Sequence, residues 1–112
     1  MKVTADQFKM GLVGYIDDEL VSKMQGWKKW ALAAECATLV DRIVNALMSG
    51  KMLEHMVSSG YATEDGMVDV DVIYGNYSSA AKKYGPITET FPLIGSVTFT
   101  ASDIDSIRRH MG

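Results

Sequence analysis

The chain has few of the residues that most often carry covalent or metal chemistry. Its one cysteine, Cys36, excludes an internal disulfide and a zinc site built on cysteine ligands. There are only two histidines, His55 and His110, so a mixed histidine and cysteine site would need nearly all of these residues in one place. Cys36 lies in a run of apolar residues that is typical of a buried, unreactive thiol. We therefore predict a protein that is not an enzyme and holds no metal or cofactor.

The chain also lacks an excess of basic over acidic residues. The 11 basic and 14 acidic residues give a formal net charge of −3, which argues against direct nucleic-acid binding. No uncharged apolar run approaches the roughly 20 residues of a membrane span. Lys2, Asp6 and Lys9 leave no apolar segment for a signal peptide near the N-terminus. We expect a cytoplasmic protein with no membrane partner.

The hydrophobic pattern predicts one mainly α-helical domain over residues 1–112. Hydrophobic residues make up 47% of the chain and charged residues 22%, as in ordinary globular proteins. We predict a compact bundle of four to five helices around a central helix at about 27–49, with a small C-terminal β-hairpin at about 87–100. The other helices are expected at about 4–24, 51–59, 69–84 and from 102, and the hairpin loop at 92–95.

Local signals refine these elements. Thr4 followed by Gln7 predicts a capping box at the first helix, and Ser102 followed by Asp105 predicts one at the last. Gly11 and Gly14 indicate close approach of another helix. The segment 27–49 carries one narrow polar stripe, so we predict that it is buried on most sides.

The segment 68–74 fits two structures. Valines alternating with Asp69 and Asp71 are typical of a strand. Val70, Ile73 and Tyr77 instead share a helix face, and this helical pattern extends over more residues. We favour a helix over 69–84 and leave the strand open.

The acidic residues between 64 and 71 form the one local field of negative charge. For Glu64, Asp65, Asp69 and Asp71 we favour helix capping and solvation. Two alternatives stay open: attraction of a basic partner, and an oxygen-ligand metal or hydrolytic site. The consecutive acids at 17–19 splay around a helix, so we expect them to be solvated.

Several apolar residues are candidates for a protein interface. Leu93 and Ile94 lie in the predicted hairpin loop and must pack on the helices or on a partner. Trp27 and Trp30 flank two lysines and belong either to the core or to an interface. Met52 and Met56 continue a four-residue step from Met48, which fits core packing or an adaptable surface. A small-molecule site between the first two long helices also stays open.

The segment 68–111 resembles small uncharacterised proteins of phages and prophages of gut bacteria. The resemblance rests on a Lys-Lys-Tyr-Gly-Pro exit at 82–86, an Ile-Thr-x-x-x-Pro-Leu-Ile-Gly hairpin at 87–95 and a Thr-Ala-Ser-Asp-Ile-Asp helix start at 100–105. It implies a phage-encoded accessory or structural protein. We therefore expect a protein that associates with itself or docks on a protein partner, as an assembly component or as an inhibitor of a host-defence enzyme such as a CRISPR nuclease.

Overall fold

The computed structural model describes residues 1–91 and 95–112 and has the predicted fold class. Helices form most of the molecule, and an antiparallel β-hairpin lies near the C-terminus. The elements are β1 (Lys2–Val3), α1 (Ala5–Tyr15), η1 (Ile16–Leu20), α2 (Val21–Lys23), α3 (Trp27–Leu47), α4 (Gly50–Ser58), β2 (Val68–Asp69), α5 (Val70–Tyr84), β3 (Ile87–Phe91), β4 (Gly95–Phe99) and α6 (Ala101–Arg109).

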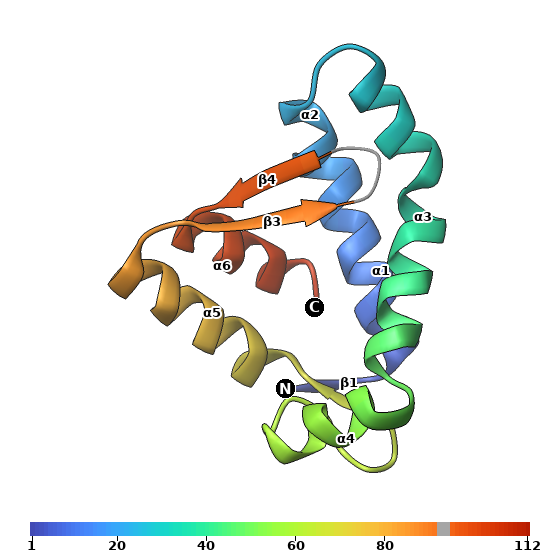
Figure 1. Cartoon of the computed structure of the whole chain (residues 1–112), viewed down its shortest axis with the longest axis vertical. Helices are drawn as coiled ribbons and strands as arrows, with labels where there is room; N and C mark the ends of the chain where they lie inside the picture. Colours follow the sequence, from blue (N-terminus) through green and yellow to red (C-terminus); the bar gives the residue numbers. More distant parts are fainter. Residues whose placement is uncertain (92–94) are drawn as a thin grey trace.

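Helix α1 joins the two sides of the molecule. It packs on α3 and on α6, while α5 and α6 pack on each other. Figure 1 shows α3 along one edge of the molecule and α5 at the opposite side. No helix in the described ranges, α3 included, combines the length and the apolar character that crossing a membrane requires.

The first predicted helix begins as expected but is not regular throughout. Thr4 and Gln7 form the predicted capping box. The helix then widens into the π-helical segment η1, in which the amide of Val21 donates to the carbonyl of Ile16, five residues earlier. The wider turn brings Tyr15 and Leu20 to the same side, although residues five apart diverge on a regular α-helix. Both side chains are buried.

Helix α3 is buried along one face only, so the prediction that it is buried on most sides is wrong. Its buried residues recur every four positions: Leu32, Cys36, Val40 and Val44. Ala33, Ala34 and Ala37 are exposed. Alanine favours a helix in water as well as in a core, so the alanine-rich pattern could not define the width of the buried face.

The ambiguous segment contains both predicted structures, one after the other. β2 pairs with β1 in an antiparallel register that sets Val3 opposite Val68. The helix α5 starts immediately afterwards, where the Asp69 carboxylate accepts a hydrogen bond from the amide of Val72 at 3.3 Å. Strand β1 has only two residues, which is too short for a sequence pattern to reveal.

The C-terminal elements lie close to the predicted boundaries, with one correction. β4 spans Gly95–Phe99, and its half-buried Val97 and Phe99 pack on the core together with Ile87 of β3. The cap of α6 is the Thr100–Asp103 capping box, two residues before the predicted pair Ser102 and Asp105. Both pairs consist of a hydroxyl residue followed three positions later by an aspartate. Because β4 ends at Phe99, the pair Thr100 and Asp103 comes first and begins the helix.

The two glycines of α1 provide a matched pair of substitutions. A Cβ on Gly11 would overlap Met111 Sδ and lie 3.0 Å from the carbonyl oxygen of His110, whereas a Cβ on Gly14 would meet His110 Cδ2 at an ordinary 3.6 Å. We expect Gly11→Ala to lower the free energy of unfolding by about 1–3 kcal/mol because α6 must shift. Gly14→Ala should raise it by up to about 1 kcal/mol through helix propensity. Urea unfolding measures both, and equal effects would contradict the close approach at Gly11.

Candidate functional site

Two predicted interface residues lie on the free face of α3. Trp27 is 65% exposed and Trp30 is 74% exposed. Ala34 and Thr38 are exposed on the same side of the helix, and Ala37 borders them. We call these five residues the outer α3 surface. Large exposed tryptophans are unusual because they leave much apolar area in water, and tryptophan is enriched at the energetic centres of interfaces.

Charged residues flank this surface. Lys28 and Glu35 are exposed on one border of it, seven residues apart and therefore nearly in line along the helix. Further along α3, Asp41 accepts a hydrogen bond from the Lys9 ammonium at 2.8 Å, which ties α3 to α1. The outer α3 surface thus has a basic and an acidic residue on the same border.

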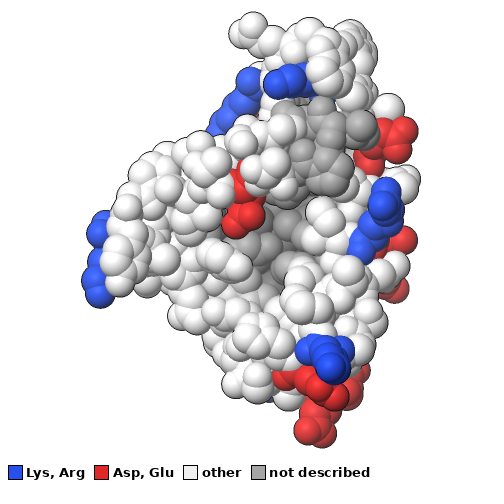
Figure 2. Space-filling model, viewed as in Figure 1, with Lys and Arg blue, Asp and Glu red and all other residues white. Residues whose placement is uncertain are grey.

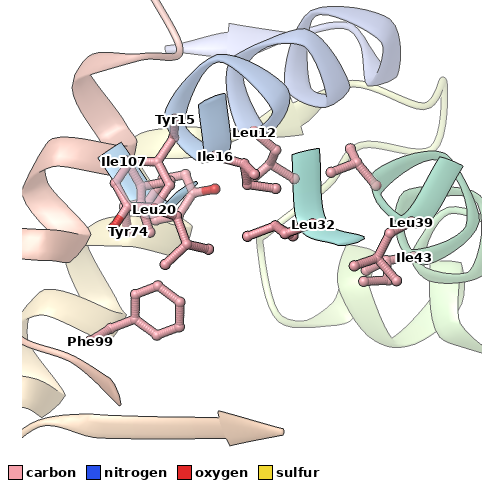
Figure 3. A pocket seen from close by; sticks show the side chains of 11 residues that line it. Leu12, Tyr15, Ile16, Leu20, Leu32, Leu39, Ile43, Tyr74, Phe99 and Ile107 are labelled. Carbon is pink, nitrogen blue, oxygen red and sulfur yellow. The ribbon is translucent and has the colours of Figure 1, made fainter. Parts of the chain in front are cut away.

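A cavity of about 230 Å³ lies on the opposite side of α3, between that helix and α1. We call it the α1–α3 cavity. Figure 3 shows Leu39 and Ile43 on one side of it and Tyr74, Ile107 and Phe99 on the other. The remaining lining residues are also apolar or aromatic: Leu12, Tyr15, Ile16, Leu20, Leu32 and Val40.

Tyr15, whose side chain lines part of this cavity, has a buried hydroxyl. Its side chain is 2% exposed, and its hydroxyl has no hydrogen-bond partner among the described residues. Its ring packs edge-on against His110, with 5.7 Å between centroids. Burial raises the pKa of Tyr15, so the hydroxyl keeps its proton at neutral pH and can donate it in a hydrogen bond. The sequence analysis missed this site because an unpartnered hydroxyl is a property of the packed chain.

A second apolar cavity adjoins the first. It measures about 330 Å³ and shares Ile43, Tyr74, Phe99 and Ile107 with the α1–α3 cavity. Tyr77 and Glu89 lie at its other end. In Figure 2 the charged side chains of the described residues lie mainly along the margins of this face, with acidic atoms also over the hairpin. The described residues that line the two cavities are therefore predominantly apolar.

The acidic stretch is largely used within the protein. Asp69 caps α5, as predicted for this group. Asp71 pairs with the N-terminal amine and accepts a hydrogen bond from Arg108 Nε at 2.6 Å, and these two contacts lower its pKa. Asp65 accepts a hydrogen bond from the Thr63 hydroxyl, which lowers its pKa as well. Glu64 is exposed.

The metal-site alternative finds no support in the part of the chain that the structure describes. Within residues 1–91 and 95–112, no three or more histidine, cysteine or acidic side chains are grouped so that they could hold a metal ion. Cys36 is buried, and burial together with the nearby Asp17 raises its pKa, as expected for an unreactive thiol.

Of the three consecutive acids of η1, Asp17 and Asp18 are exposed, as expected, and Glu19 is half-buried, and all three also have contacts within the protein. The thiol of Cys36 lies 3.5 Å from Asp17 Oδ1, and His110 Nε2 lies 3.3 Å from Asp18 Oδ2. Glu19 accepts a hydrogen bond from the Ser106 hydroxyl at 2.7 Å. The π-helical turn changes the direction of these side chains, so two of them reach α6.

The remaining interface candidates differ in their accessibility. Met56 is buried in the core and Met52 is 46% exposed, so the two do not form a continuous surface stripe. Both residues lie on α4, and only Met56 belongs to the core. Leu93 and Ile94 lie outside the described residues.

Comparison of the chain with protein-family models, with curated proteins and with solved structures gives no match. The functional argument therefore rests on the outer α3 surface and on the two adjoining cavities.

The contacts of His110 predict a pH-dependent contribution to stability. Its Nδ1 lies 2.9 Å from the Ser106 carbonyl oxygen, and this hydrogen bond, with Asp18 and Glu19 nearby, raises the pKa of His110. A raised folded-state pKa gives stability that is complete below the ordinary value of about 6.5 and is lost as the pH rises through the folded-state pKa. We expect His110→Gln to cost about 0.5–1 kcal/mol more at pH 5.5 than at pH 8.5 in urea unfolding.

The control is the wild-type protein, unfolded in urea at the same two pH values. A cost of His110→Gln that does not vary with pH would show that the imidazolium contacts contribute nothing.

Proposed function

We propose that this chain is a non-enzymatic interaction protein that associates with a second copy of itself through the outer α3 surface. Such a protein fits the role of a phage-encoded accessory or assembly component. The observation that carries the proposal is the pair of exposed tryptophans, Trp27 and Trp30, on the same helix face as the exposed Ala34. Burying two tryptophans in a partner removes several hundred Å² of apolar surface from water at about 25 cal/mol per Å².

The order of large and small residues favours a second copy as the partner. The bulky residues lie at the N-terminal end of the outer α3 surface and the small ones follow them. Two α3 helices that pair antiparallel about a two-fold axis near position 32 would set Trp30 against Ala34 of the second copy. The same register sets Trp27 against Ala37 of the second copy, next to Thr38. A two-fold interface requires this kind of self-complementary patch.

The flanking charges agree with the same register. In an antiparallel pair with this axis, one border of a helix faces the same border of its copy. Lys28 would then lie within one residue of Glu35 of the second copy, close enough for an ion pair, and the contact would occur twice. Exposed ion pairs of this kind contribute little affinity, but they select the register and disfavour alternatives in which like charges meet.

The acidic stretch supports assembly over inhibition of a basic host enzyme. An inhibitor that mimics nucleic acid needs free carboxylates in a dense group. Asp69 and Asp71 are instead committed to the start of α5 and to Arg108. Self-association instead uses the outer α3 surface, whose residues are all exposed.

Ala34→Arg tests the proposal. Arginine is a good helix former, so this exposed substitution should change the free energy of unfolding by less than about 0.5 kcal/mol. It places a long charged side chain where Trp30 of the second copy would pack. We expect a loss of at least about tenfold in the association constant, measured by sedimentation equilibrium. Ala46→Arg is the matched control, because Ala46 is exposed on α3 outside the outer α3 surface.

Two results would overturn the proposal. One is a wild-type chain that stays monomeric at the highest concentration reached. The other is equal weakening by Ala34→Arg and Ala46→Arg. A separate titration with a single-stranded oligonucleotide tests nucleic-acid binding, because two tryptophans flank two lysines at the start of α3. Tight binding that both tryptophans require would assign this surface to nucleic acid instead.

A further inference from the structure

We propose that the cavity between the C-terminal end of α3 and the β-hairpin binds a small apolar amine, whose ammonium group pairs with the carboxylate of Glu89. This is the cavity of about 330 Å³ that adjoins the α1–α3 cavity, and we call it the α3–hairpin cavity. Its α3 residues are Ile43 and Leu47, which lie outside the outer α3 surface. This proposal and the proposed self-association can therefore fail independently.

Glu89 occupies a core-facing position of the hairpin. In the register of the two strands, Glu89 lies opposite Val97 and Ile87 lies opposite Phe99. Side chains alternate between the two faces of a strand, so Glu89 shares the face of Ile87. Ile87, Val97 and Phe99 all pack against the core. An acidic residue is unusual among such apolar neighbours, and this position directs its carboxylate towards the α3–hairpin cavity, which Glu89 lines.

The carboxylate of Glu89 is accessible and has no competing partner in the part of the chain that the structure describes. Glu89 is exposed and also lines the cavity, so its carboxylate lies where the cavity opens to solvent. No hydrogen bond or ion pair joins it to any described residue. No Lys, Arg or His is among the described residues of the lining. Figure 2 shows acidic atoms over the hairpin, apart from the charged margins of this face. Such a carboxylate attracts a cation and repels an anion.

Tyr77 supplies a second polar group at the same end of the cavity. Burial raises the pKa of Tyr77, and the nearby Tyr61 and Glu89 raise it further, so the hydroxyl stays neutral at physiological pH. A primary ammonium has three N–H donors, so it can donate to the Glu89 carboxylate and also to the Tyr77 oxygen. The aromatic rings of Tyr74 and Phe99 in the lining attract a cation as well.

The volume of the cavity defines the apolar part of the ligand. An engineered apolar cavity of about 150 Å³ in another protein binds benzene, so about 330 Å³ accommodates roughly ten to thirteen non-hydrogen atoms. Beyond Glu89 and Tyr77, the described lining is apolar or aromatic, and dispersion and removal of apolar surface from water provide the attraction. An arylalkyl amine such as 3-phenylpropylamine has this size and carries its one charge at the end of the molecule.

Three probes of equal non-hydrogen atom count separate the charge from the apolar body: 3-phenylpropylamine, 3-phenyl-1-propanol and phenylacetate. In calorimetric titration of the full chain at neutral pH, the amine should bind most tightly, the alcohol more weakly and phenylacetate not at all. Glu89→Gln keeps the size of the side chain and removes its charge. It should weaken amine binding roughly five- to tenfold and leave the alcohol within about twofold. Glu64→Gln is the matched control, because Glu64 is exposed outside this cavity.

Leu47→Trp tests the apolar part, because Leu47 is half-buried and lines this cavity but not the α1–α3 cavity. The larger side chain should fill the space and abolish binding of both the amine and the alcohol. A fourth probe, N-acetyl-lysine amide, carries the same ammonium without the aromatic ring. It should bind at least about tenfold more weakly than 3-phenylpropylamine, because it buries less apolar surface.

The proposal is overturned if the amine does not bind the wild type or if phenylacetate binds as tightly. It is also overturned if Glu89→Gln and Glu64→Gln weaken amine binding equally, which would leave the inward charge as protection of the strand edge. Unchanged binding to Leu47→Trp, once circular dichroism shows that this variant is folded, would contradict the location. Equal or tighter binding of N-acetyl-lysine amide would assign the site to a lysine side chain of another protein instead.

Discussion

The one-sided packing of α3 on α1 is the constraint on which both proposed sites depend. Leu32, Cys36, Val40 and Val44 form a single buried line along α3. The opposite face is left in water, where the two tryptophans lie. On the inner side, residues of α1 and α3 line the α1–α3 cavity together with residues of α5, α6 and β4, and Ile43 and Leu47 of α3 line the α3–hairpin cavity. A helix buried on all sides would provide neither feature.

The π-helical segment η1 determines where several side chains next to α3 and α6 point. Its wider turn brings Tyr15 and Leu20 to the same cavity and directs Asp18 and Glu19 towards α6. A regular helix would separate Tyr15 from Leu20. Irregular helical turns of this kind lower local stability and are frequent at functional sites. The α1–α3 cavity therefore borders the irregular part of the helical framework.

Much of the fold could be predicted from the sequence because its signals are local. The capping box at Thr4, the glycines that α6 approaches and the hairpin strands all follow from short patterns. The width of the buried face of α3 could not be predicted, because exposed and buried alanines have the same helical preference. The sequence predicts the cap of α6 at Ser102, two residues after the observed Thr100, because both positions begin a capping-box pattern.

The candidate site was predictable only in part. The tryptophans stand out in any sequence, although their exposure depends on which face α1 covers. The Tyr15 hydroxyl and the cavity beside it arise from long-range packing, for which a single sequence contains no pattern. The four-residue step of Met52 and Met56 fitted either core packing or a surface, and only the packed chain shows that Met56 is buried while Met52 is exposed.

The antiparallel pairing of two α3 helices can be tested most directly with the charge-reversed variants Lys28→Glu and Glu35→Lys. Each variant alone sets like charges near one another in both contacts of the pair, whereas a mixed pair restores two opposite-charge contacts. Sedimentation velocity of each variant and of their equimolar mixture makes the comparison. The account predicts weak association of either variant alone and recovery in the mixture. Equal association in all three samples would contradict it.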